Sequence, residues 1–276
     1  MMTNFKKALA NKGFVVGGCI FLAIALIALV GPLVWTVNPN AQEMMLRLSA
    51  PSPAHPFGCD DFGRDLLARV IAGARVSLGV GIAVTLATSA LGLVIGAYAY
   101  HNERLDHILM RICDGFMSIP GVLLAIALMA MMGASVWNVI IALVIVYTPS
   151  MARIVRSRAM VVKEEPFVEA LRVQGASTAR IVWLHIVPNV MAPFLVQATF
   201  VFAEAVLSEA ALSFLGLGIK APDASWGNIL QAGKNVMRKA WWMIFFPAAA
   251  IIASVLSLNL AGDGLRDALD PKTKED

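Results

Sequence analysis

Long uninterrupted blocks of apolar residues constrain the fold of this chain more than any other feature. The first block runs from Phe14 to Val37, and charged or Pro- and Gly-rich stretches separate it from the later ones. A helix needs about 20 apolar residues to cross a hydrocarbon layer of about 30 Å, because each residue rises about 1.5 Å. Blocks of this length predict membrane-spanning helices, whereas a soluble core would show apolar residues at helical or strand period.

The composition agrees with a membrane protein and argues against two other classes. The sequence is 59% hydrophobic and only 14% charged, where a soluble domain carries about 25% charged residues. The net charge of +4 is small and is not gathered into one patch, so nucleic-acid binding has little support. Cys19, Cys59 and Cys113 are far apart in the sequence, which predicts neither a metal site nor a disulfide framework.

The length rule predicts six spans and therefore an all-α integral membrane fold. The predicted spans are Phe14–Val37, Val76–Tyr100, Ile108–Met132, Val136–Val155, Val190–Leu212 and Trp242–Leu260. The first follows several lysines, as a secretory signal does, but its apolar run is too long and no small-residue cleavage site follows it. We therefore expect it to remain as an uncleaved first span.

Basic residues predict the orientation of these spans. With six spans both termini share one side, and cytoplasmic termini place fourteen of the 22 basic residues inside, in agreement with the positive-inside rule. These fourteen are Lys6, Lys7, Lys12, Arg104, Arg111, Arg153, Arg156, Arg158, Lys163, Arg172, Arg180, Arg266, Lys272 and Lys274. The expected location is a bacterial inner membrane, with several passes and both the N- and C-termini cytoplasmic.

Three predicted connections are too long to be simple turns. Residues 38–75 and 213–241 lie outside in this orientation, and residues 156–189 lie inside. Long connections in a compact bundle are usually functional or disordered. We expect two parts: residues 1–75 hold the N-terminal tail, the first span and an outer segment, and residues 76–276 hold the core bundle with the cytoplasmic loop 156–189.

The inner loop contains the signals of a short helix. Pro166 fits the first turn of a helix, where the helix dipole favours the acidic residues Glu164 and Glu165 nearby. Gly175 fits the C-terminal end of the same helix. A second helical piece is predicted from Ser177 to Leu184, with Pro188 breaking it before the fifth span. A short capped helix that projects from a membrane bundle has a shape suited to docking into a groove on another protein, although an ordinary amphipathic surface helix has the same signals.

At these residues the loop resembles that of importer permeases of the ATP-binding-cassette (ABC) superfamily. The signature of that loop is Glu-Ala-Ala, three residues, Gly, then nine residues to an Ile-x-Leu-Pro ending, and Glu169, Ala170, Gly175 and Pro188 fall in register with it. Leu171 replaces the second alanine, His185 the isoleucine and Val187 the leucine. The Glu, Gly and Pro of the signature remain, so the resemblance implies that the docking role is intact.

The resemblance continues through most of the chain. Residues 55–65, 73–78, 212–218 and 259–271 resemble blocks of the dipeptide, oligopeptide and nickel permease branch, with Cys59 where threonine is usual. Pro222, Ser225, Trp226 and Gly227 continue the third block. The chain is therefore identified as similar to a C-type permease subunit of a dipeptide or oligopeptide importer. This implies a type I ABC importer permease fold with a cytoplasmic coupling helix, and import of peptides from periplasm to cytoplasm. Relatives of the branch also carry nickel complexes or glutathione-like peptides, so the cargo remains open.

The resemblance also implies partners and site residues. The expected partners are a second homologous permease in a heterodimer, two cytoplasmic ATP-binding subunits, a periplasmic solute-binding protein and the lipid bilayer. The residues expected to couple the chain to the ATPases are Glu169, Ala170, Gly175, Ala176 and Pro188. ATP and Mg are expected on the partner ATPases, with no cofactor on this chain and no catalytic role for it.

Two glutamates in the fifth predicted span are candidates for lining the transport pathway. Glu204 and Glu209 lie inside or near the end of that span, and an ionised carboxylate at the bilayer centre costs about 2.5 to 3.5 kcal/mol on insertion scales. Each should therefore face water or protein. For Glu209 a hydrogen bond between packed helices is an equally good interpretation, while Glu204 is the better candidate for substrate contact.

Other classes of function have less support. A secondary transporter driven by protons or sodium through Glu204 or Glu209 should have two related halves and broken midplane helices, and the sequence has neither. A membrane enzyme would need a nucleophile and base, or metal ligands, at one depth. The sequence shows no such cluster, so we expect no catalytic residues. We also expect no metal site, because His55, His101, His107 and His185 are spread over both sides of the predicted membrane.

Overall fold

The computed structural model describes residues 9–99 and 103–269, and in these ranges all regular structure is helical apart from one isolated bridge between Cys59 and Asp65. The helices are α2 (Lys12–Val34), α3 (Leu66–Ala99), α4 (Glu103–Met117), α5 (Gly121–Met132), α6 (Val136–Lys163), α7 (Pro166–Val173), α8 (Thr178–Ile181), α9 (Val187–Phe214), α10 (Trp226–Lys234) and α11 (Trp242–Leu269). A 3-10 turn covers Met44–Leu46, and a π-helical segment, Val182–Ile186, joins α8 to α9.

Five helical stretches are long and apolar enough to cross a membrane. They are α2, α3, α6, the continuous stretch Thr178–Phe214 and α11, and the bent pair of α4 and α5 makes a sixth if it counts as one span. The prediction of an all-α membrane fold with about six spans is confirmed.

The third predicted span, Ile108–Met132, is not one straight helix. Its two halves meet at an angle of 88°, because Pro120 interrupts the helical hydrogen bonding and disfavours helical backbone at the residue before it. The first half, α4, is held to α6 by two ion pairs, Asp106 with Arg156 and Asp114 with Arg153. The apolar run between residues 108 and 132 concealed this bend, since hydropathy does not report direction.

Helix α3 begins at Leu66, well before the predicted start at Val76. Arg69 and Arg75 interrupt the apolar run, but both have partners within the protein. Nε and Nη2 of Arg75 donate to the carbonyls of Ala28 and Leu29 in α2, over 2.7 and 2.9 Å, and Arg69 donates to Pro39 and Asn40. Asp65 caps the helix by accepting a 2.7 Å hydrogen bond from the backbone N–H of Ala68. The boundary expected between residues 75 and 76 therefore falls inside one continuous helix.

Pro188 does not break the helix before the fifth span, contrary to the prediction. The π-helical segment directly before α9 widens the helix, and Pro188 then occupies the first turn of α9, where its missing N–H costs little. The connection 213–241 also contains a helix that was not predicted, α10, which begins with a capping box between Ser225 and Asn228.

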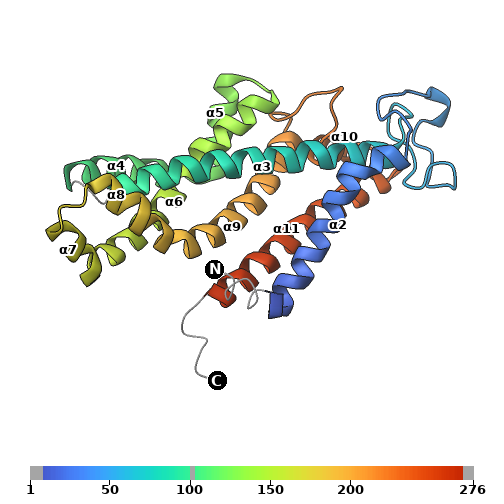
Figure 1. Cartoon of the computed structure of the whole chain (residues 1–276). Helices are drawn as coiled ribbons and strands as arrows, with labels where there is room; N and C mark the ends of the chain where they lie inside the picture. The colour runs from blue at the N-terminus through green and yellow to red at the C-terminus, as the bar shows by residue number, and fades with distance from the viewer. Residues whose placement is uncertain (1–8, 100–102, 270–276) are drawn as a thin grey trace.

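Figure 1 shows α7 and α8 at one end of the long helix α3 and the irregular segment 35–65 at the other end. The core comprises three clusters along this axis. One joins α2, α3, α10 and α11 around Trp226, another joins α3, α5, α6 and α9 around Leu143, and a third lies near α7 and contains Val168 and Ile186. Helix α3 contributes residues to all three clusters or packs against them, so it connects the two ends of the bundle.

Helices α2 and α11 pack through glycine. A Cβ atom built on Gly17 would lie 2.5 Å from the carbonyl oxygen of Ser257 and 2.7 Å from the amide nitrogen of Ala261. Only a residue without a side chain allows this approach, as at other crossings of membrane helices. Because α2 has few other buried residues, this crossing and the hydrogen bonds from Arg75 of α3 hold it on the bundle.

Carboxylates organise the irregular segment 35–65. Asp65 accepts hydrogen bonds from Nε1 of Trp35 over 3.0 Å and lies 2.8 Å from Nδ1 of His55. Burial, together with the charges of Asp65 and Asp60, raises the pKa of the Cys59 thiol to about 11. At neutral pH Cys59 is therefore an uncharged, buried packing residue.

Candidate coupling surface and transport pathway

The start of α7 follows directly from its sequence. Glu165 is the N-cap residue with extended backbone, and Pro166 takes the first helical turn. Proline is suited to that position because its fixed φ is already helical and the N–H it lacks would have had no partner. Glu169 lies in the first turn and Arg172 in the last, each at the end of the helix where the dipole favours its charge.

The end of α7 is a glycine stop of the Schellman type. The N–H of Ala176 donates to the carbonyl of Leu171 over 3.0 Å, and the N–H of Gly175 donates to that of Arg172 over 3.0 Å. Gly175 has φ of 79°, a left-handed conformation that glycine adopts without strain. The helix predicted between Pro166 and Gly175 is therefore present with both of its expected ends.

One face of α7 is anchored in the protein. Val168 has no exposed surface and packs in the cluster that contains Val182 and Ile186, with Leu171 and Ala176 packed against it. Only two residues separate α7 from the end of α6, and its other end leads through a short turn into α8. A force on α7 therefore acts on α6 and on the stretch Thr178–Phe214 together.

The opposite face of α7 is open and mixes charge with apolar surface. We call this face the coupling surface; it consists of the exposed residues Phe167, Glu169, Ala170, Arg172 and Val173. Val173 is 84% exposed, and a hollow of about 500 Å³ lies beside Glu169 and Arg172. Exposed apolar side chains next to polar ones are typical of a surface that docks another protein.

The five residues expected to couple the chain to ATPases do not all lie on this surface. Glu169 and Ala170 do, whereas Gly175 shapes the end of α7, and Ala176 is half-buried against the cluster that contains Val168 and Ile186. Pro188 is exposed at the first turn of α9. Phe167 and Val173 were not among the predicted coupling residues, although an apolar residue on the polar side of a short amphipathic helix is a usable signal.

Glu209 lies in the interior of the bundle and not on an open surface. It has no exposed area, and its two carboxylate oxygens accept hydrogen bonds from Ser77 over 2.6 Å and from Ser213 over 2.7 Å. The hydroxyl of Ser77 also accepts a hydrogen bond from the backbone N–H of Trp226, and that of Ser213 accepts one from the backbone N–H of Ile219. This arrangement ties α3, α9 and α10 together and favours the packing interpretation over pathway lining for Glu209.

Glu204 has a different environment on the same helix. It is exposed, and it lines a groove of about 530 Å³ between α9 and α11 together with Gln197, Asn259 and Asp263. Within the described residues, no side chain pairs with its carboxylate, although Tyr147 donates a 3.3 Å hydrogen bond to its backbone carbonyl. Polar side chains on spanning helices cannot face lipid at low cost, so this groove needs water or another protein beside it.

Three residues of this groove were not predicted from the sequence. Gln197, Asn259 and Asp263 stand out only as polar residues within otherwise apolar stretches, and α11 must fold back beside α9 to bring them together. Sequence periodicity places residues on one helix face but does not pair helices, which explains the omission.

Family models match the chain in two places. The model described as the binding-protein-dependent transport system inner membrane component matches residues 88–275, and the N-terminal transmembrane domain of oligopeptide transport permease C matches residues 4–51. The first match covers more than half of the chain.

Curated relatives match nearly the whole length. A putative peptide transport system permease of Brucella abortus is 45% identical over 269 residues, which is 98% of this chain and 91% of that protein. The dipeptide transport system permease DppC of Alkalihalophilus pseudofirmus is 42% identical over 271 residues (98% and 89%), and the oligopeptide permease OppC of Bacillus subtilis is 38% identical over 267 (96% and 88%).

A solved structure has the same fold. An inward-facing form of the MetNI methionine ABC transporter superimposes with a TM-score of 0.61 at 20% identity, covering 74% of this chain and 98% of that chain. At this level of identity the match establishes the fold alone, which is that of an ABC importer permease.

Proposed function

The chain belongs to the family of binding-protein-dependent transport system inner membrane components, and we propose that it acts as a permease subunit of an ATP-driven importer of peptides. The single observation that carries this proposal is the coupling surface on α7, a short helix anchored by Val168 and open on its other face. Such a helix fits a groove on a separate motor protein.

The proposed mechanism uses α7 as the point where force enters the bundle. Two cytoplasmic ATPases bind the coupling surfaces of this chain and of a second, homologous permease. When ATP binding draws the ATPases together, α7 moves with them, and α6 and the stretch Thr178–Phe214 follow because both are joined to α7. Rigid-body rocking of the two permeases then changes the side to which the pathway opens.

In this proposal the chain itself performs no bond chemistry. ATP and Mg bind to the partner ATPases, and the sequence contains no phosphate-binding Gly-rich loop that ends in Lys and Ser or Thr. Cytoplasmic ATPases also require α7 on the cytoplasmic side of a bacterial inner membrane. With an even number of spans, both termini lie on that side too, in agreement with the distribution of basic residues.

Glu204 and the groove between α9 and α11 are the proposed wall of the pathway. Their support is the groove of about 530 Å³ and its four polar side chains on two spanning helices. The second permease would cover this groove and leave a polar passage between the two chains. A periplasmic solute-binding protein delivers the peptide at the opposite end of the bundle from α7.

The test of this proposal is ATPase co-purification after charge reversal on the coupling surface. Glu169→Lys should leave membrane insertion intact and weaken ATPase association at least about tenfold, since a like or mismatched charge in an interface costs several kcal/mol. Gly175→Pro should do the same by disrupting the end of α7. The matched control is Glu43→Lys, an exposed glutamate at the other end of the bundle. Unchanged co-purification in both α7 variants would contradict the proposal.

A further inference from the structure

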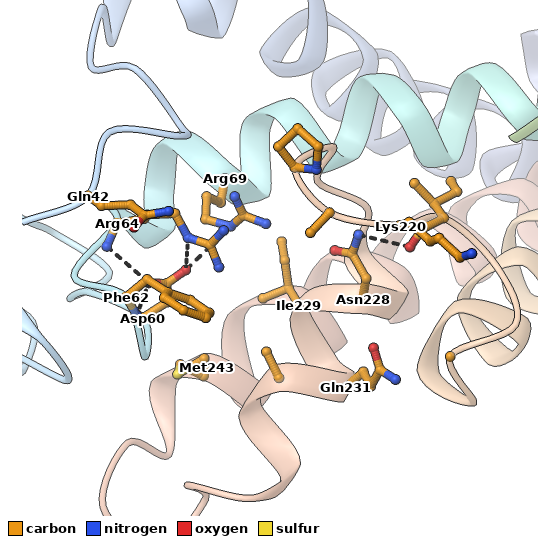
Figure 2. Close-up of a pocket in the computed structure, with 15 residues that line it drawn as sticks. Gln42, Asp60, Phe62, Arg64, Arg69, Lys220, Asn228, Ile229, Gln231 and Met243 are labelled. Atoms are coloured by element: carbon orange, nitrogen blue, oxygen red, sulfur yellow. Dashed lines mark hydrogen bonds and ion pairs between the residues drawn. The ribbon is translucent and has the colours of Figure 1, made fainter. Parts of the chain in front are cut away.

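A cavity of about 480 Å³ lies at the end of the bundle opposite α7, between the irregular segment 35–65 and residues 216–222, which lead into α10. Figure 2 shows its wall, with Arg64, Arg69 and Asp60 on one side and Lys220 on the other. Its size falls in the range of small-molecule sites, about 300 to 1,000 Å³.

The charged side chains of this cavity are predominantly cationic. Arg64, Arg69 and Lys220 line it, against a single carboxylate, Asp60. One oxygen of Asp60 accepts a 2.6 Å hydrogen bond from Nε of Arg64 and lies 3.5 Å from Nε of Arg69. The other oxygen accepts hydrogen bonds from the backbone N–H groups of Phe62 and Arg64. Asp61, outside the lining, is a second carboxylate beside them, 3.9 Å from Nη2 of Arg64. Two carboxylates thus face two guanidinium groups, and Lys220 adds the excess positive charge of the wall.

The two arginines are held in place before any ligand arrives. Arg69 is 4% exposed and Arg64 is 8% exposed. Nη1 of Arg69 donates to the carbonyl of Pro39 and to the side-chain oxygen of Asn40, both over 3.2 Å. A guanidinium fixed in this way loses little conformational entropy when it binds a carboxylate, the group its planar fork fits best.

The rest of the wall suits the body of a small organic molecule. Phe62, Ile219, Ile229 and Met243 supply apolar surface, while Gln42 and Gln231 supply amides. Apolar walls with a few convergent polar groups are characteristic of small-ligand sites, whereas a docking surface for a protein is flatter. An almost buried arginine inside a cavity can be reached only by a narrow group.

We propose that this cavity binds the free carboxylate end of a short peptide, with the guanidinium of Arg69 as its fixed partner. The exposed side chain of Lys220 turns in from the opposite wall to pair with the same carboxylate. The inference rests on the proposed function, which places this end of the bundle on the side from which peptides arrive. The apolar wall then receives the side chains of the peptide. The site gives the permease a contact with its cargo that is separate from the groove around Glu204.

The test measures binding of dialanine to the complete complex of permeases and ATPases in lipid nanodiscs, without the solute-binding protein. Dialanine amide is the second probe, because it lacks the carboxylate and keeps the rest of the molecule. Loss of a hydrogen bond to a charged group should weaken binding about tenfold to a hundredfold. The variants are Lys220→Gln, whose side chain is exposed, and Arg69→Gln; Lys239→Gln, exposed and outside the cavity, is the matched control.

We expect dialanine to bind the wild type and Lys239→Gln equally. We also expect it to bind at least about tenfold more tightly than dialanine amide. Lys220→Gln should weaken dialanine binding and leave amide binding unchanged. If Arg69→Gln fails to fold, Lys220→Gln decides alone. Absence of dialanine binding to the wild type, or equal binding by Lys220→Gln, overturns the inference.

One further result would also overturn it. If Lys220→Gln weakens capture of the purified solute-binding protein but not dialanine binding, the cavity is a docking site for an acidic side chain of that protein. ATP-driven uptake of dialanine by the complex with its binding protein tests the proposed function separately. Continued uptake without binding at the cavity would therefore contradict this inference alone.

Discussion

The hydroxyl of Ser77 on α3 donates a 2.6 Å hydrogen bond to the carboxylate of Glu209 on α9, although the two residues are 132 positions apart in the sequence. This contact lies where α10 also meets the two long helices, since the N–H of Trp226 donates to the same hydroxyl over 3.3 Å. The contact therefore fixes three elements at the end of the bundle opposite α7.

Replacing Glu209 should lower the stability of the fold. Glu209→Ala leaves the hydroxyls of Ser77 and Ser213 without their buried acceptor, at a cost of about 1 to 3 kcal/mol for each orphaned group. Thermal unfolding in detergent, followed by tryptophan fluorescence, should show a lower midpoint. Glu169→Ala, at an exposed position, is the control and should unfold at the wild-type temperature. An unchanged midpoint for Glu209→Ala would argue against a structural role.

Glu204 should behave in the opposite way to Glu209. Because its carboxylate is exposed in the groove, Glu204→Gln should leave the unfolding temperature unchanged. If the groove lines the pathway, the same variant should reduce uptake of peptides with a free amino group, by about tenfold if one charge-assisted hydrogen bond is lost. Uptake by reconstituted vesicles measures this. Wild-type uptake by Glu204→Gln would remove Glu204 from the proposed pathway.

Much of the fold was predictable from sequence because hydropathy reports burial in lipid directly. Proline and glycine likewise fixed the ends of α7 at Pro166 and near Gly175. The bend at Pro120 has a local cause, but hydropathy does not report the direction of a helix. The early start of α3 was not predictable, since it depends on partners distant in the sequence. Arg75, for example, looks like the end of a loop until the carbonyl groups of α2 are beside it.

The candidate site divides in the same manner. The residues of α7 are local, so a short motif was sufficient to place them. The groove around Glu204 depends on how α11 packs against α9, and the ion-paired cavity wall depends on how Asp60 meets Arg69. Neither arrangement is encoded in the spacing of residues within one segment.

The crossing of α2 and α11 provides a third prediction. Gly17→Leu should clash with the backbone of Ser257 and Ala261, and forcing a large side chain into a packed site costs about 1 to 3 kcal/mol. We expect a lower unfolding temperature and faster proteolysis of α2. Gly18→Leu is a close control, because a Cβ at Gly18 meets nothing within 4 Å. Equal behaviour of the two variants would contradict the crossing.

Backbone strain at Gly175 can be tested with another glycine of the same chain as reference. Gly175 and Gly133 have φ of 79° and 82°, and a Cβ at either would meet nothing within 4 Å. Valine should therefore introduce backbone strain of about 1 to 3 kcal/mol at Gly175, and at least as much at Gly133, whose ψ of 163° lies in a region that essentially only glycine occupies. Only Gly175→Val should weaken ATPase association, measured by co-purification, because Gly133 ends α5 and lies away from α7. A similar loss in both variants would indicate general destabilisation.

The most direct test of the central claim is the accessibility of position 169. Glu169→Cys, in a chain whose three native cysteines are replaced by serine, is treated with a membrane-impermeant maleimide in intact cells and in inverted membrane vesicles. Our account predicts labelling only in inverted vesicles, and protection there when the ATPases are bound. Labelling from outside intact cells, or full labelling in the presence of bound ATPases, would contradict α7 as the helix through which ATPases drive transport.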